Sequence, residues 1–158
     1  MSDQKTLVII KPDAIKRGLI GAVITQLETL QLELLAAKAV RVSRELAEEH
    51  YKFLREKDFF EELLDFIQGK QHGTHYVLAL VLSGHNAIER VRKLAGATDP
   101  LKANPLSIRG SLGRSIMENI LHASSDAGES KREIALWFQP KELLEPVQSA
   151  PKRSQAIS

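Results

Sequence analysis

The sequence predicts an α+β fold in which a four-stranded antiparallel sheet carries helices on its face. Three observations lead to this prediction: four short apolar runs suited to strands, stretches of helical spacing between them, and no internal repeat. The expected order is β-α-β-α(α)-β-α-loop-β-α, in which two pairs of strands flank single helices. That order fits a ferredoxin-like split β-α-β sandwich better than a doubly wound sheet.

The first two strands and the helix between them occupy the start of the chain. Residues 7–10, Leu-Val-Ile-Ile, predict a buried strand that stops at the Lys-Pro-Asp breaker of residues 11–13. Apolar residues from position 20 to position 30 recur with the spacing of one helix face. Residues 34–42 are apolar apart from two basic side chains and predict the second strand.

The middle of the chain predicts a helical pair, a loop and the central strand. Residues 44–67 have helical periodicity in two pieces, with Asp58 as the expected N-cap between them. Residues 68–75 are polar and contain two glycines, which is typical of a loop. Residues 76–82 are the most apolar run and predict a strand buried on both faces. Asn86 is the expected cap of the helix that follows.

The last third begins with a segment that has no periodicity. Residues 96–111 contain two prolines and two glycines, and a loop of this length inside a compact domain is usually functional or disordered. Residues 116–122 are partly apolar and supply the last expected strand. Asp126 and Glu129 resemble a capping box for one more helix, and residues 140–144 predict a final helical turn.

The length and composition indicate one globular domain. The chain has 158 residues, of which 43% are hydrophobic and 27% charged, as is ordinary for such proteins. We expect a single domain over residues 1–146 and a loose C-terminal tail over residues 147–158.

Composition also excludes several classes of protein. The chain has no cysteine, which excludes disulfide scaffolds, zinc–thiolate sites and cysteine nucleophiles and fits a reducing cytoplasm. We expect no secretory signal and no membrane helix, because no stretch approaches ~18 apolar residues. A net charge of +2 argues against a dedicated nucleic-acid binder but leaves room for a local basic pocket for a small anion.

One of the five histidines stands out as a candidate nucleophile. His50 lies on an apolar helix face and is interpreted as a core residue. His72 and His75 lie three positions apart in a glycine loop and lack further metal ligands, and His85 lies at a turn. His122 ends an apolar segment and precedes small residues at the expected start of a helix, where backbone N–H groups attract phosphate.

Two further features of the sequence favour phosphate chemistry. Glu133 could reach back across the helix to one ring nitrogen of His122, fix its tautomer and leave the other nitrogen free to attack. Lys11, Arg92 and Arg109 could stabilise a transferring phosphoryl group, although each taken alone would be interpreted as a solvated surface charge. The chain has no P-loop motif.

Taken together, these residues resemble the nucleoside diphosphate kinase family over about residues 6–144. The opening segment Ile10-Lys11-Pro12-Asp13 and the segment Asn119-Ile120-Leu121-His122-Ala123-Ser124 both resemble family signatures. The other matching segments, in order, are residues 17–21, 49–51, 58–60, 96–100, 108–110, 132–134 and 136–138.

The resemblance implies a ping-pong transfer of the γ-phosphate from a nucleoside triphosphate to a nucleoside diphosphate. It also implies Mg²⁺ carried by the nucleotide phosphates and a homo-oligomer, a tetramer or hexamer built from dimers. The resemblance implies that His122 is the phosphorylated nucleophile, that Ser124 and Glu133 support it, and that Tyr51 borders the phosphate site. It implies that Lys11 and Asn119 contact the sugar hydroxyl, that Lys11 also approaches the transferring phosphate, and that Phe59 stacks on the base. It implies that the phosphates are held by Arg92, Thr98 and Arg109.

The sequence departs from the family pattern near these residues. The histidine is followed by Ala-Ser-Ser-Asp at residues 123–126, whereas the family usually has Gly-Ser-Asp-Ser. Residues 105–112 lack the usual glycine, aspartate and phenylalanine of the loop, and residues 69–76 are longer than the usual turn. The family's usual closing segments are missing from the C-terminus.

Two alternative functions remain open on the sequence alone. The fold could serve as a non-catalytic nucleotide-binding or protein-interaction module, although the joint presence of the basic residues, Asn119 and His122 argues against this. A nucleic-acid-binding sheet would need exposed aromatic residues on its strands, and the strands offer only Tyr76, Trp137 and Phe138. We therefore expect neither a nucleic-acid partner nor a membrane.

Overall fold

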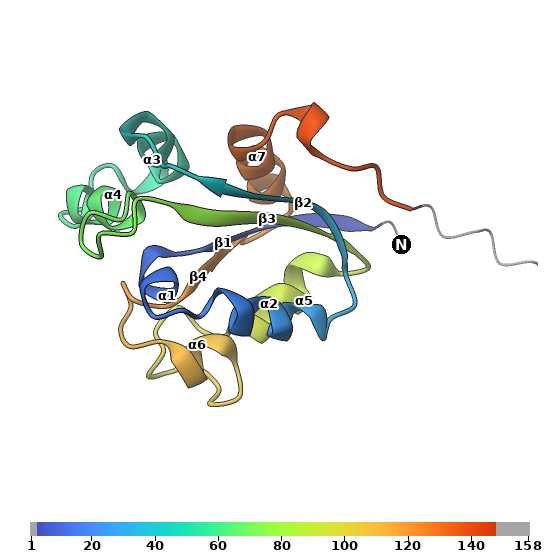
Figure 1. The fold of residues 1–158 in the computed structure, drawn as a ribbon, viewed down its shortest axis with the longest axis horizontal. Coiled ribbons are helices and arrows are strands. Elements are labelled where there is room, and N and C mark those ends of the chain that lie inside the picture. Colours follow the sequence, from blue (N-terminus) through green and yellow to red (C-terminus); the bar gives the residue numbers. More distant parts are fainter. Residues whose placement is uncertain (1–2, 148–158) are drawn as a thin grey trace, which may run out of the picture.

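A computed structural model describes residues 3–147 (Figure 1). Its sheet has four strands in the order β2-β3-β1-β4, and every neighbouring pair is antiparallel. The strands are β1 (Gln4–Ile10), β2 (Glu33–Val40), β3 (Val77–Gly84) and β4 (Leu121–Ala123). This sheet confirms the α+β fold class and the strand order of a split β-α-β sandwich.

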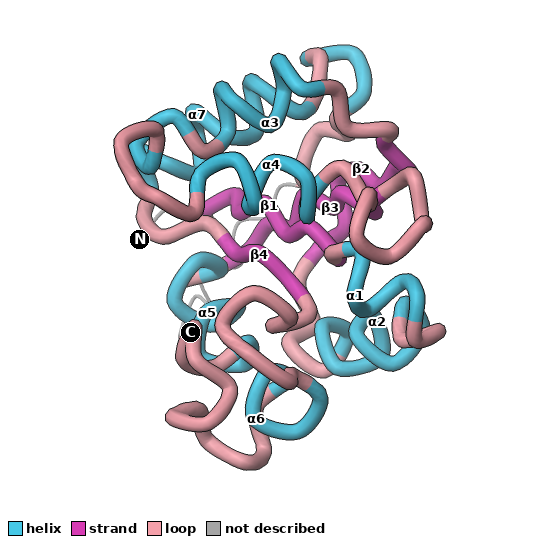
Figure 2. The backbone as a smooth tube through the Cα atoms, turned by 90° about the vertical axis from the view of Figure 1, so that its left-hand side faces the viewer, coloured by secondary structure: helices cyan, strands magenta, loops and turns pink. Residues whose placement is uncertain are grey.

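Helices cover both faces of the sheet (Figure 2). One face carries α3 (Arg44–His50), α4 (Phe60–Ile67) and α7 (Ala127–Trp137), with the short 3₁₀ segments η1 (Lys52–Leu54) and η2 (Pro140–Glu142) nearby in the chain. The other face carries α1 (Pro12–Lys16), α2 (Ile20–Glu28), α5 (Ala87–Ala95) and α6 (Ile108–Leu112).

The alternation of side chains along β1 explains why the sheet lies between two helical layers. Leu7 and Ile9 belong to the apolar cluster under α3, α4 and α7, whereas Val8 and Ile10 belong to the cluster on the opposite face. All four are fully buried, as expected for a central strand with successive side chains on opposite faces. β1 ends at Ile10, so Lys11 is the first residue after this buried strand.

Three local predictions about helices are wrong. The Lys-Pro-Asp segment was expected only to end a strand, but Pro12 begins the helix α1, a position where its missing N–H costs nothing. Asp58 is not an N-cap, because α4 begins after Phe59 and no side chain caps it. The expected loop over residues 96–111 contains the start of α6, which Ser107 caps by accepting the Gly110 N–H at 3.0 Å.

Other boundaries also differ from expectation. Asn86 takes the N-cap position of α5 with a φ of 50°, but its side chain makes no capping hydrogen bond. The last strand covers only Leu121–Ala123 instead of residues 116–122. Asp126 does cap α7 by accepting the Glu129 N–H at 2.8 Å, whereas the Glu129 carboxylate pairs with Arg132.

Within residues 3–147, no helix is long and apolar enough to cross a membrane. Most of the tail predicted over residues 147–158 lies outside the described residues.

Candidate active site

One cavity gathers eight of the ten residues that the sequence singled out. It has a volume of about 520 Å³ and lies between the end of β1, the α3–α4 region, α5, α6 and β4. Its lining contains no carboxylate, so its charged groups are cationic. The predicted site residues in the lining are Lys11, Tyr51, Phe59, Arg92, Thr98, Arg109, Asn119 and His122. Larger hollows exist elsewhere, but the reactive side chains gather in this one.

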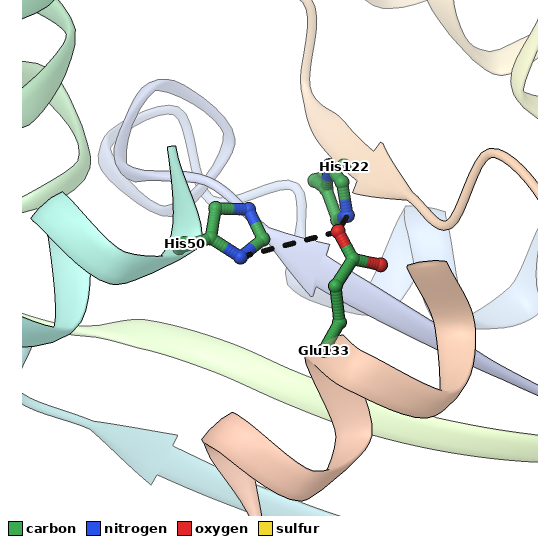
Figure 3. A group of neighbouring side chains, drawn as sticks. All are labelled: His50, His122 and Glu133. Carbon is green, nitrogen blue, oxygen red and sulfur yellow. Dashed lines mark ion pairs between the residues drawn. The ribbon is translucent and has the colours of Figure 1, made fainter. Parts of the chain in front are cut away.

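The other two predicted residues, Ser124 and Glu133, lie buried behind His122. His122 is on β4, opposite Ile9 of β1, and its side chain is 22% exposed. Its Nε2 atom lies 2.7 Å from Oε2 of Glu133 on α7. The contact has the distance of an ion pair but not the angle of a good hydrogen bond. Because Glu133 occupies the Nε2 side of the ring, Nδ1 is the nitrogen left for other chemistry (Figure 3).

Ser124 fixes the orientation of the Glu133 carboxylate. Its hydroxyl donates to Glu133 Oε1 at 2.7 Å and accepts the Leu7 N–H at 3.1 Å. The two carboxylate oxygens therefore have separate partners, one on Ser124 and one facing His122. This chain of contacts ties the imidazole to the backbone of β1, so the ring is held before any ligand arrives.

His50 borders this pair from the α3 side. Its ring lies edge-on to the His122 ring with the centroids 4.7 Å apart, and its Nδ1 accepts a hydrogen bond from Trp137 Nε1 at 3.0 Å. An indole N–H can only donate, so Nδ1 carries no proton. Burial lowers the pKa of His50 well below its usual value, and a positive charge on His122 lowers it further. Because His50 is neutral, it does not compete with His122 for the negative charge of the Glu133 carboxylate.

The donor atoms of His50, His122 and Glu133 lie within 4.8 Å of one another and are the candidate metal ligands among the described residues. Two nitrogens and one oxygen suit a transition metal such as zinc better than Mg²⁺, which prefers oxygen ligands. The indole hydrogen bond also occupies His50 Nδ1. This cluster therefore does not fit Mg²⁺.

Lys11 brings a buried ammonium group to the cavity. Its Nζ donates to the Asn119 Oδ1 at 2.7 Å and to the Met117 carbonyl at 2.8 Å. It also lies 4.8 Å from the centroid of the Phe66 ring, within range of a cation–π contact. Burial lowers the pKa of Lys11 to about 8, with the opposing attraction of Asp13 as the next cause.

Arg109 is held in place by backbone carbonyls. Its guanidinium donates to Gly96, Leu121 and Asn119 carbonyls at 2.9, 2.7 and 3.3 Å. Burial lowers its pKa to about 10, and the charge of Arg92 contributes in the same direction. The loop after α5, α6 and the start of β4 are thereby joined at one cationic side chain.

The Asn119 amide connects two parts of the site. It accepts from Lys11 through Oδ1 and donates through Nδ2 to the Thr98 carbonyl at 3.0 Å. The amide orientation is consistent with both contacts, since ammonium can only donate and a carbonyl can only accept.

The backbone just before β4 is strained. Ile120 has a φ of 78°, an outlier for a β-branched residue, and such conformations cost about 1–3 kcal/mol. Asp13 Oδ2 accepts the Ile120 N–H at 3.0 Å, and the Ile120 carbonyl accepts the Lys11 N–H at 2.9 Å. The end of β1 therefore stabilises the turn that places Asn119 and His122.

Tyr51 and the apolar mouth complete the cavity. The Tyr51 side chain is buried, and burial followed by the charge of Glu133 raises the pKa of its hydroxyl. Phe59, Phe53 and Ile116 line the same cavity and are 44%, 66% and 62% exposed. Such exposed apolar side chains offer a stacking surface for a planar ring.

Sequence reasoning missed three contributions to this site. His50 was interpreted as a core residue, and its burial agrees with that, but its contact with His122 had no local signal. Asp13 was noted as part of a breaker and of a family signature, and its hydrogen bond to Ile120 was not anticipated. Phe53 fell within the helical pair predicted over residues 44–67, but it lies in the 3₁₀ segment η1 and is exposed at the cavity.

Comparisons with known proteins show the family to which this chain belongs. A family model described as nucleoside diphosphate kinase matches residues 4–143. The nucleoside diphosphate kinase of Pyrococcus horikoshii is 46% identical, and the match covers 90% of this chain and 89% of that protein. The protein of the same name from Pyrococcus furiosus is 44% identical over 93% of this chain and 90% of its own length.

Solved structures are similar over the same length. The halophilic nucleoside diphosphate kinase from Halobacterium salinarum in complex with CDP has a TM-score of 0.85 and 42% identity, and covers 91% of this chain and 93% of that chain. A nucleoside diphosphate kinase family protein from Babesia bovis has a TM-score of 0.85 and 36% identity, and covers 92% and 95%.

Proposed function

Because the chain belongs to the nucleoside diphosphate kinase family, and so transfers the γ-phosphate of a nucleoside triphosphate to a nucleoside diphosphate, we propose specific roles for its residues in that reaction. The transfer runs in two half-reactions through a phosphohistidine at His122. The observation that carries this proposal is the pairing of His122 Nε2 with the buried Glu133 at the wall of a carboxylate-free cavity.

In the first half-reaction, His122 Nδ1 attacks the γ-phosphorus of the bound triphosphate. An N–P bond forms, the bond to the bridging oxygen breaks, and the nucleoside diphosphate leaves with that electron pair. The proton on Nε2 stays beside the Glu133 carboxylate, which stabilises the positive charge that the ring acquires. In the second half-reaction, a terminal oxygen of another diphosphate attacks the phosphorus and the N–P bond breaks.

The cationic and polar side chains hold the phosphates for this attack. Lys11 has three N–H donors and uses two on protein acceptors, and Arg109 has five and uses three. The remaining donors are available to phosphate oxygens, together with Arg92 and Thr98, which line the same cavity. Positioning and charge stabilisation of this kind supply most of the catalysis in phosphoryl transfer.

The remaining residues bind the nucleoside and border the phosphate. Lys11 and Asn119 contact the sugar hydroxyl, Phe59 stacks on the base, and Tyr51 lines the phosphate site next to His122. The similar protein from Halobacterium salinarum was solved in complex with CDP, and that complex supports a nucleotide as the occupant of this cavity. Stacking discriminates little between bases, since every base has a π-face.

We propose that Mg²⁺ enters as part of the nucleotide substrate. The cavity lining has no carboxylate to hold the ion, and the His50–His122–Glu133 cluster has the wrong donors for it. Phosphate oxygens supply hard ligands instead, and the ion neutralises part of their charge. The residues of this chain then bind the oxygens that the ion leaves unoccupied.

A homo-oligomer, tetramer or hexamer built from dimers, is part of the same proposal. It is supported by β2, which is an edge strand of the sheet and leaves Leu34 49% exposed. The cytoplasmic location stays a prediction from the sequence.

The phosphohistidine is tested by incubating the protein with Mg²⁺ and ATP radiolabelled at the γ-phosphate, followed by a quench without acid. We expect label on the wild-type chain that is acid-labile, is removed by GDP and is missing from His122→Ala. If the protein binds ATP and takes no label, the catalytic roles are wrong, and the non-catalytic nucleotide-binding module becomes the better description.

A further inference from the structure

His72 and Glu118 form a contact that joins the loop before β3 to the segment that precedes β4. The two residues are 46 positions apart, and His72 Nε2 lies 2.9 Å from Glu118 Oε1. Their side chains are 15% and 37% exposed. The loop that carries His72, residues 69–76, is longer than the turn that the family usually has at this place. The contact therefore depends on a feature that distinguishes this chain from the family pattern.

The two ring nitrogens of His72 define its hydrogen-bonding state. An ionised Glu118 carboxylate can only accept, so Nε2 is the donor. Nδ1 is buried and has no hydrogen-bond partner among residues 3–147. Nδ1 therefore takes no part in the contact with Glu118. His72 is thus a directed donor to Glu118.

Glu118 lies between the two acceptors of the Lys11 ammonium. Met117 and Asn119, its neighbours on either side, accept from Lys11 Nζ at 2.8 and 2.7 Å. A bond that restrains Glu118 also restrains the spacing of these two acceptors. Burial lowers the pKa of Lys11, and the negative charge of Glu118 is one of the smaller contributions that oppose this shift.

The imidazole of His72 reaches Lys11 by a second route. Its ring packs edge-on against Phe66, with the centroids 5.2 Å apart at an interplanar angle of 82°. Phe66 is fully buried, and the Lys11 ammonium lies over its ring, 4.8 Å from the centroid. His72 therefore contacts both structures that surround the ammonium, the Phe66 ring and the turn that contains Glu118.

We propose that His72 is a positioning residue for phosphoryl transfer, which holds the Glu118 turn and the Phe66 ring so that Lys11 points at the transferring phosphate. The inference rests on the role proposed above for Lys11. His72 touches no substrate, so its effect passes through Lys11 and appears in the transition state rather than in nucleotide binding.

The test compares His72→Ala, Glu118→Ala, the double variant and Glu118→Gln by steady-state kinetics and by the rate of label transfer from ATP. We expect His72→Ala and Glu118→Ala each to lower kcat and kcat/KM together by about fivefold to tenfold, which corresponds to the net contribution of one typical intramolecular hydrogen bond. The double variant should lose no more than either single one. Glu118→Gln keeps an acceptor oxygen and should retain most of the activity.

The matched control is His75→Asn, an exposed histidine of the same loop whose φ of 61° asparagine tolerates. It should leave the kinetics unchanged. The inference fails if His72→Ala behaves like this control, or if its loss appears only near its melting temperature. It also fails if the losses of the single variants multiply in the double one. If the wild type takes no label at all, the proposed function fails and this inference with it, so the two failures are distinguishable.

Discussion

Lys11 should give the catalytic efficiency an alkaline limb that begins near pH 8. Burial lowers the pKa of its ammonium to about 8, and kcat/KM reports the pKa values of the free enzyme. At pH 9 about one molecule in ten then keeps the proton, so kcat/KM should fall about tenfold between pH 7 and pH 9. Bound phosphate favours the ammonium, so the limb in kcat should lie at a higher pH.

The assay is the initial rate of phosphoryl transfer from MgATP to a diphosphate between pH 7 and pH 10. Lys11→Arg serves as the control, because a guanidinium keeps its charge near pH 8; this variant should be less active and show no limb near 8. Other cavity groups do not explain a limb there, since the pKa of Arg109 is about 10 and that of Tyr51 is raised. A wild-type kcat/KM that stays flat to pH 10, or an identical limb in Lys11→Arg, would refute the reasoning.

The same pKa shift predicts an effect on stability with a defined sign. The folded pKa of Lys11, about 8, lies below the ordinary value of 10.5, so the unfolded chain binds more protons between these pH values. The contribution of Lys11 to the free energy of unfolding therefore increases as pH rises from 8 to 10.5. The difference of 10.5 − 8 pH units corresponds to about 3 kcal/mol. Urea titrations should find that the difference in stability between wild type and Lys11→Met changes by about that amount over this range.

Three further predictions concern the cavity and its supports. Glu133→Gln keeps the shape but removes the charge beside the imidazole, so rapid-quench assays should find phosphoenzyme formation slower by about 100-fold, with ATP affinity retained. Gly110→Ala should lower the stability by about 1–3 kcal/mol in thermal unfolding, because the added Cβ would lie 2.0 Å from the Asn104 carbonyl oxygen. Gly128→Ala is the matched control, because the nearest atom to its added Cβ would be 3.4 Å away. Phe59→Ala should raise KM for ATP and GTP alike by about tenfold with kcat nearly unchanged, because one stacked base contributes about 1–3 kcal/mol.

Strands could be predicted from the sequence where a local run of residues is enough to determine the secondary structure. The run Leu-Val-Ile-Ile at residues 7–10 is buried on both faces and could only be a central strand or a buried helix, and its shortness favoured the strand. The last strand was overestimated, because residues 116–122 are only partly apolar and the first apolar residue of the segment, Ile116, is 62% exposed. The left-handed Ile120 ends the extended backbone, and its support comes from Asp13, which is 107 positions away. No local pattern carries that contact.

The site was predictable only in part for the same reason. The reach of Glu133 back to the ring could be anticipated because one helix separates the two residues, and the structure has this contact at 2.7 Å. The contact of Lys11 with Asn119 joins residues 108 positions apart, and only the family resemblance brought them together. His72 was noted as a weak metal ligand, since the sequence does not tell that Glu118 lies opposite it.

The displaced aspartate after the nucleophile has a structural explanation. Asp126 caps α7, and the N–H bond from Glu129, assisted by other contacts that include the charge of Arg92, lowers its pKa. It lines a neighbouring hollow of about 710 Å³ together with Arg92, which lines the cavity beside His122 as well. His122 is held by Ser124 and Glu133, neither of which depends on Asp126. The one-position shift therefore leaves the contacts of His122 with Glu133 and Ser124 in place, and we expect any effect of the shift to pass through Arg92, for which we propose a phosphate-binding role.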